Sequence, residues 1–164
     1  MRETTTTPLV PDDAFGLLRS YSRHRDYVRL ALTVVGQACE RRALIHDATK
    51  MLDDEFAGFS RINAAARIHK FGSPEYSEGM QRERGTIDLH FSRNSHHPES
   101  GPQTFLDVIE MVCDWWGARK GYDDPRPWAT SVELNLSAKG QFLTPEQLWL
   151  AREVAAFLDA EAPQ

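Results

Sequence analysis

The segment between residues 103 and 119 constrains the fold more than any other part of the chain. Its sequence, QTFLDVIEMVCDWWGAR, repeats apolar residues at steps of three and four, which is the period of an α-helix. Apolar side chains cover most of its circumference, and a single acidic stripe interrupts them: Asp107, Glu110 and Asp114. A helix of this kind is normally buried, so other elements of the chain must cover it.

Helical patterns on both sides of this segment predict those covering elements. We expect helices over residues 14–38, 40–50, 53–70 and 73–93, and a last helix that follows the cap and proline of Thr144-Pro145. Val132, Leu134 and Leu136 alternate with polar residues, which indicates a short extended piece. The prediction is an all-α fold with a loose tail at residues 1–11 and one helical domain over residues 12–162.

Composition excludes several classes of protein. The 164 residues carry a formal net charge of −5, which argues against a general nucleic-acid binder. No apolar run approaches the roughly 20 residues of a membrane span, and no signal-peptide pattern follows Met1, so we expect a cytoplasmic protein. The phosphate loops, dinucleotide fingerprints, CxxC pairs and serine elbows of common enzyme folds are missing from the sequence.

His46 and Asp47 are the first candidates for chemistry. They follow three apolar residues in the stretch ALIHDATK, and Lys50 comes one helical turn after His46. Burying a carboxylate is costly unless it is paired, and imidazole nitrogen beside carboxylate oxygen suits a divalent transition metal. Further along, Asp53, Asp54 and Glu55 open a helix, where acidic residues favour the helix dipole.

A second concentration of ligand-type residues lies where a predicted helix breaks into a loop. Three of the six histidines fall within eight residues there: His90, His96 and His97. A hinge of this kind can direct one histidine from the helix and others from the loop toward a common point. An exposed polar loop is the alternative interpretation.

Two other features are open to both a structural and a functional interpretation. His24 lies on the apolar face of the predicted helix 14–38, where a histidine is either a core residue or a ligand. The acidic stripe that ends in Asp114 marks either a narrow solvent face or an internal polar site. Helix bundles often build metal sites from side chains on facing helices, which favours the ligand interpretation when these residues are taken together.

The order and local sequence of these residues resemble the HD-domain superfamily of metal-dependent phosphohydrolases. The finer pattern is similar to an uncharacterised family of bacterial and phage HD-like proteins. The matching motifs are the H-basic-x-YV opening (residues 24–28), the HDxxK motif (46–50) followed by EF (55–56), the NxHHPE loop (94–99) and the EMxxDW helix (110–115).

The resemblance implies a helical metal-binding domain with one or two divalent ions of Mn, Fe, Co, Ni, Zn or Mg. It implies that the first ion is bound by His24, His46, Asp47 and Asp114. A second ion would be held by His90 with His96 or His97, and Asp47 would bridge the two. Lys50 and Glu55 are the candidates for catalytic roles, and the supporting candidates are Glu110, Arg25 and Arg93.

The activity expected from this resemblance is hydrolysis of a small phosphorylated or nucleotide substrate by metal-activated water. Lys50, with Arg25 or Arg93, would offset the charge of the phosphate. Two alternatives follow from the same residues. One is a di-iron oxygenase of the HD type, and the other is a binding module without catalytic activity that keeps a metal for structure.

Overall fold

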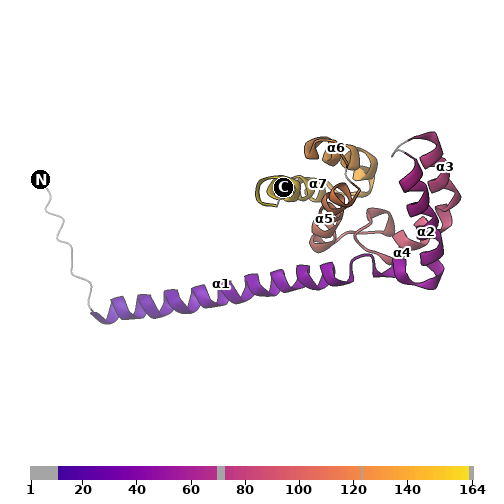
Figure 1. The fold of residues 1–164 in the computed structure, drawn as a ribbon. Helices are drawn as coiled ribbons and strands as arrows, with labels where there is room; N and C mark the ends of the chain where they lie inside the picture. The colour runs from indigo at the N-terminus through magenta and orange to yellow at the C-terminus, as the bar shows by residue number, and fades with distance from the viewer. Residues whose placement is uncertain (1–10, 70–72, 123, 163–164) are drawn as a thin grey trace, which may run out of the picture. The chain divides into compact units, whose positions relative to one another are not determined.

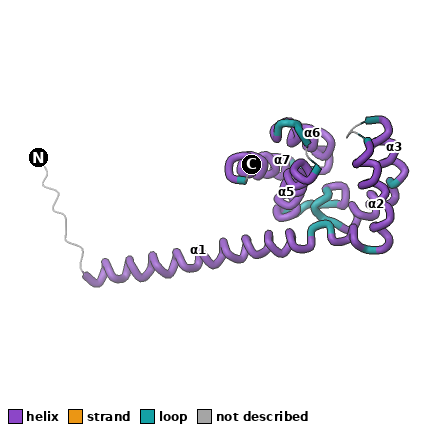
Figure 2. The backbone as a smooth tube through the Cα atoms, in the orientation of Figure 1, coloured by secondary structure: helices purple, strands orange, loops and turns teal. Residues whose placement is uncertain are grey.

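The computed structural model describes residues 11–69, 73–122 and 124–162, and within these ranges every regular element is helical (Figures 1 and 2). The all-α prediction is therefore confirmed. The chain divides into two compact units, Met1–Leu44 and Ile45–Gln164. Of the predicted tail, residues 1–10 lie outside the described residues, and Pro11 is the first residue of a helix.

The first unit is dominated by α1, a single helix over Pro11–Ile45. It runs through the boundary that we predicted near residue 39, because nothing between the two predicted segments breaks the helix: residues 36–42 contain one glycine and no proline. His24 and Arg25 lie on this helix. None of the helices in the described part of the chain combines the length and hydrophobicity that crossing a membrane requires.

The second unit begins with the His46-Asp47 turn, and five helical elements follow it. They are the 3-10 helix η1 (Ala48–Met51), α2 (Asp53–Ile68), α3 (Pro74–Arg82), α4 (Arg84–Arg93) and the 3-10 helix η2 (Pro98–Ser100). Ser73 caps α3 through its side chain, as the Ser-Pro sequence predicts. The predicted helix 73–93 is divided at Glu83, whose carboxylate pairs with Arg61 of α2.

The remaining elements are α5 (Phe105–Gly121), α6 (Trp128–Lys139), the 3-10 helix η3 (Gly140–Phe142) and α7 (Pro145–Glu161). Thr104 and Thr144 each form a capping box with the residue three positions later. The extended piece predicted over residues 132–136 is wrong, since these residues lie within α6. Val132 and Leu136 are buried one turn apart, whereas Leu134 is half exposed.

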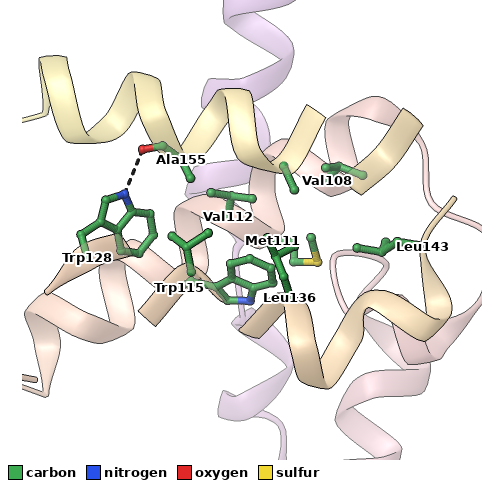
Figure 3. Packing of buried hydrophobic residues seen from close by; sticks show 10 residues of the cluster. Val108, Met111, Val112, Trp115, Trp128, Leu136, Leu143 and Ala155 are labelled. Atoms are coloured by element: carbon green, nitrogen blue, oxygen red, sulfur yellow. Dashed lines mark hydrogen bonds between the residues drawn. The ribbon is translucent and has the colours of Figure 1, made fainter. Parts of the chain in front are cut away.

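The hydrophobic core of the second unit lies between α5, α6 and α7 (Figure 3). As predicted for the 103–119 segment, α5 is buried, and it contributes the largest of the fully buried apolar side chains, Met111, Val108 and Val112. The Trp128 indole donates a hydrogen bond of 2.9 Å to the carbonyl of Ala155, so its polar atom is satisfied inside the core. This core fixes α5, which carries the acidic stripe.

A close contact fixes the position of α2 relative to α4. Gly58 lies so near Thr86 that a Cβ added at Gly58 would come within 2.1 Å of the threonine hydroxyl. Only glycine permits this approach. The contact holds the two helices at the separation that brings Glu55 of α2 against His90 of α4.

Candidate metal centre

His46 and Asp47 lie in a tight turn between α1 and η1, and not within a helix as the pattern over residues 40–50 predicted. Asp47 has φ 56° and ψ 14° and is the one residue other than glycine with positive φ in the described chain. Asp tolerates this left-handed conformation better than most residues, yet it still costs about 1–3 kcal/mol. Strain of this kind, over-determined by its surroundings, clusters at functional sites.

The turn directs Asp47 toward the histidines of α4 and the following loop. Asp47 Oδ1 lies 3.0 Å from His90 Nε2 and 3.5 Å from His96 Nε2, and the centre of the His97 ring lies 4.1 Å from that of the tilted His96 ring. One atom of each residue is buried and has no hydrogen-bond partner: Asp47 Oδ1 and the Nε2 atoms of His90, His96 and His97. Such groups are rare in folded proteins and need an explanation.

Glu55 determines which nitrogen of His90 faces Asp47. Its carboxylate is fully buried and accepts a hydrogen bond of 2.8 Å from His90 Nδ1. The Thr49 hydroxyl and the Arg93 guanidinium donate to the same carboxylate at 2.9 and 3.1 Å. With its proton held on Nδ1, a neutral His90 presents the lone pair of Nε2 to Asp47.

Glu110 of α5 likewise orients two other imidazoles, and it does so with one carboxylate oxygen. Its Oε1 lies 2.9 Å from His46 Nδ1 and 3.3 Å from His96 Nδ1. Both rings therefore turn their Nε2 atoms away from Glu110. Histidines that bind metals almost always donate their other ring N–H to a carboxylate or carbonyl in this manner.

Asp114, one turn further along α5, completes a second group of ligand-type atoms. His46 Nε2 lies 3.3 Å from Asp114 Oδ1 and 3.5 Å from Asp47 Oδ2. Lys50 forms a short ion pair with the same Oδ2 of Asp47, and its ammonium lies 4.9 Å from the centre of the Phe59 ring. The side chains of His46, Asp114 and Lys50 are 27%, 27% and 30% exposed, so this group borders solvent.

The spacing of these atoms fits a divalent ion. Bonds of about 2.0–2.1 Å in a tetrahedral zinc site place neighbouring ligand atoms about 3.3 Å apart. Imidazole nitrogens lie 3.0 and 3.5 Å from Asp47 Oδ1 and 3.5 Å from Asp47 Oδ2. Two groups thus share Asp47, one made of His90, His96 and His97 and the other of His46 and Asp114.

The loop that carries His96 and His97 is fastened on both sides of the two histidines. Ser95 donates a hydrogen bond of 2.6 Å to Asp107, which also closes the capping box of α5. The Gln103 amide donates to the carbonyls of His97 and Gly101 at 3.4 and 3.2 Å. The loop histidines are therefore held toward Asp47 by contacts that do not involve their rings.

Charges in the site shift the pKa of several ligand-type groups. Hydrogen bonds with Asp114 and then Glu110 raise the pKa of His46 to about 10. Burial, together with the neighbouring His96 and His90, lowers the pKa of His97 to about 2, and burial also lowers that of His96. Burial raises the pKa of Asp47, but the contacts with His90 and Lys50 outweigh it and keep the pKa below its usual value.

Of the residues singled out in the sequence, the structure brings most of them together in the second unit. They are His46, Asp47, Lys50, Glu55, His90, Arg93, His96, His97, Glu110 and Asp114. Arg93 pairs with Asp54 and Glu55, which raises its pKa and occupies it with the carboxylate that orients His90. His24 and Arg25 lie in the first unit, so their roles stay predictions.

Two residues of the site escaped the sequence analysis. Thr49 and Asn94 lie beside His90: the Asn94 amide donates hydrogen bonds of 2.8 Å to the Thr49 hydroxyl and to the carbonyl of His90. Both belong to motifs that drew attention for other reasons, HDxxK and NxHHPE. Their fixed spacing from His46 and His96 is the signal that could have identified them.

Comparison with known proteins identifies the family of the chain. No curated protein and no solved structure matches it. The match to a family covers residues 14–161, which include both groups of ligand-type residues and most of α1. The chain belongs to DUF5662, a family of unknown function.

Proposed function

We propose that the protein is a metal-dependent phosphohydrolase of the HD type that acts on a small phosphorylated or nucleotide substrate. One observation supports this proposal above the others. The Nε2 atoms of His46, His90 and His96 face the carboxylate of Asp47, while carboxylates hold their Nδ1 atoms. This arrangement directs the three nitrogens toward a cation beside Asp47. The Nε2 atoms of His90 and His96 are buried without a hydrogen-bond partner, and His46 Nε2 would exchange its contact with Asp114 for the ion.

The group that borders solvent suits the catalytic ion. His46, Asp47 and Asp114 would bind it. A divalent ion bound there would lower the pKa of a water molecule and polarise a phosphoryl oxygen, so that hydrolysis proceeds near neutral pH. The second ion would be bound by Asp47 with His90, His96 and His97.

The protein supplies orientation and charge for such a reaction. Glu110 and Glu55 orient the imidazoles through their Nδ1 atoms, and the left-handed turn holds Asp47 between the two groups. Lys50 is partly exposed beside Asp47, where its ammonium can offset the negative charge of a phosphate. Phe59 lies under the same ammonium and limits where the lysine side chain can move.

Metal analysis combined with a substrate panel tests the proposal. Protein purified without chelator should contain bound divalent metal and should hydrolyse members of a panel of phosphomonoesters and nucleotides. Asp114→Asn keeps the shape of the side chain but removes a charge, so metal affinity and turnover should both fall steeply while the fold survives. Asp88→Asn, an exposed change on α4, is the control and should leave both unchanged.

An Asp114→Asn protein with unchanged metal content and unchanged turnover would remove this residue from the site, and the HD assignment with it. Full metal content without hydrolysis of any panel member would instead favour the binding-module alternative.

The histidine-rich ligand set also suits the di-iron oxygenase alternative. Four imidazoles and the carboxylate of Asp114 lie around the shared carboxylate of Asp47, and imidazole with carboxylate is a ligand set that iron accepts. Two irons per chain, together with oxygen uptake in the presence of a reductant, would favour this reaction over hydrolysis. Zinc, manganese or magnesium with phosphate release would exclude it.

A further inference from the structure

The two groups around Asp47 differ in their access to water. His90 and His96 have 1% and 2% of their surface exposed, and all four ligand-type atoms of their group are buried. In the other group, His46 and Asp114 are each 27% exposed. If each group binds an ion, the site with His46 and Asp114 would thus be open to substrate, and the site with His90 and His96 would be closed.

We infer that His90, His96, His97 and Asp47 form a closed, four-coordinate zinc site that stabilises the fold, and that only the His46–Asp114 side exchanges its ion and binds substrate. This inference rests on the metal centre of the proposed function, but not on the reaction. Structural zinc sites have four protein ligands, whereas catalytic sites keep one position for water or substrate.

The number and type of ligands support this division. Three imidazole nitrogens and one carboxylate oxygen fill a tetrahedral shell, and zinc accepts both ligand types. His97 belongs to this group alone among those that the described residues form, as Asp114 belongs to the open group alone. With His97 included, all four corners are protein atoms, so no position remains for water.

The connections of the closed group explain what a structural ion would do. His90 comes from α4, His96 and His97 from the loop that leads to η2, and Asp47 from the turn before η1. An ion bound by all four would join α4 and the loop after it to the turn at Asp47, which lies far from them in the sequence. Around it, the rings of His90, Phe91, His96 and His97 contact one another at centroid distances of 4.1–6.4 Å.

Matched variants of the full chain test this inference, with zinc alone as the probe. The wild-type protein, loaded with zinc, should release one equivalent to a chelator quickly and retain another for hours. Asp114→Asn should lose the fast equivalent and keep the slow one with little change in Tm. His97→Ala should lose the slow equivalent, and its Tm should fall by about 10 °C, the size expected when a site saturated about a thousandfold above its Kd is lost.

Cobalt substitution of the wild-type protein avoids dependence on a variant that fails to fold. One equivalent of Co²⁺ should give the intense visible bands of tetrahedral coordination. Weak bands typical of six-coordinate cobalt would overturn the inference, as would loss of the slow zinc from Asp114→Asn or its retention by His97→Ala. If zinc-loaded protein keeps the slow equivalent but hydrolyses nothing in the substrate panel, the proposed reaction is refuted and the structural zinc site is not.

Discussion

Substitution of Glu110 by Gln tests how much one carboxylate contributes to metal affinity when it orients two histidine ligands. Glu110 Oε1 lies within 3.3 Å of the Nδ1 atoms of both His46 and His96. Loss of a single partner of this kind costs about 10–100-fold in metal affinity, which is about 1.4–2.7 kcal/mol. The glutamine oxygen can still accept from one imidazole, but its amide group offers a donor to the other. Because two ligands are affected, we expect a loss near the upper end, about 100-fold.

Competition with a chromophoric zinc chelator measures this change directly. The control is Asp88→Asn, an exposed change on α4 whose carboxylate pairs with Arg84. It should leave stability within a few tenths of a kcal/mol and zinc affinity near that of the wild type. If Glu110→Gln binds zinc as tightly as the wild type, the reasoning about imidazole orientation is refuted. The same conclusion follows if Asp88→Asn weakens zinc binding equally.

Three further substitutions or conditions have expected outcomes. Gly58→Ala should lower the free energy of unfolding by about 1–3 kcal/mol in chemical denaturation, because the new methyl group overpacks against Thr86. The double variant with Thr86→Gly should recover most of this loss. A Gly58→Ala protein of unchanged stability would contradict the close contact. Asp47→Ala should lower stability as well as metal content, because alanine tolerates the left-handed turn poorly, whereas Asp47→Asn should mainly lower metal content. Metal affinity should rise about tenfold per pH unit from pH 6 to 8, because bound metal must displace the proton that His46 holds with a pKa of about 10. Calorimetry in buffers of different ionisation enthalpy should show that proton release. In chelator-treated protein, folding stability should fall as the pH rises, whereas metal affinity rises. The stability that the raised pKa of His46 contributes is complete below pH 6.5 and is lost as the pH rises toward about 10.

The sequence allowed the helical class and several helix boundaries to be predicted, because these depend on local signals. The apolar circumference of α5 and the caps at Ser73 and Thr144 are examples. The error at α6 arose because Val132 and Leu136 satisfy both a period of two and a helical step of four. Over so short a window, only the tertiary contacts of α6 with α5 and α7 decide between the two.

The residue types of the candidate site could be predicted from the sequence, whereas the contacts between those residues could not. The concentration of histidines before Pro98 and the acidic stripe of α5 indicated which residues to examine. Glu55 was a candidate for a catalytic role, but its contact with His90, which spans 35 positions of sequence, was not predicted. No periodic pattern reports a contact of that kind, since it depends on the approach of α2 and α4 at Gly58.

The left-handed turn at Asp47 has a consequence for the order in which the site forms during folding. In an unfolded or partly folded chain, Asp47 would relax to an ordinary backbone conformation and gain about 1–3 kcal/mol by doing so. The contacts that hold it in the strained state come from Lys50 nearby and from His90 and His96, about 45 residues away. The turn is therefore expected to be set late, after α4 has docked on α2, so that the ligand geometry appears only in the nearly native protein.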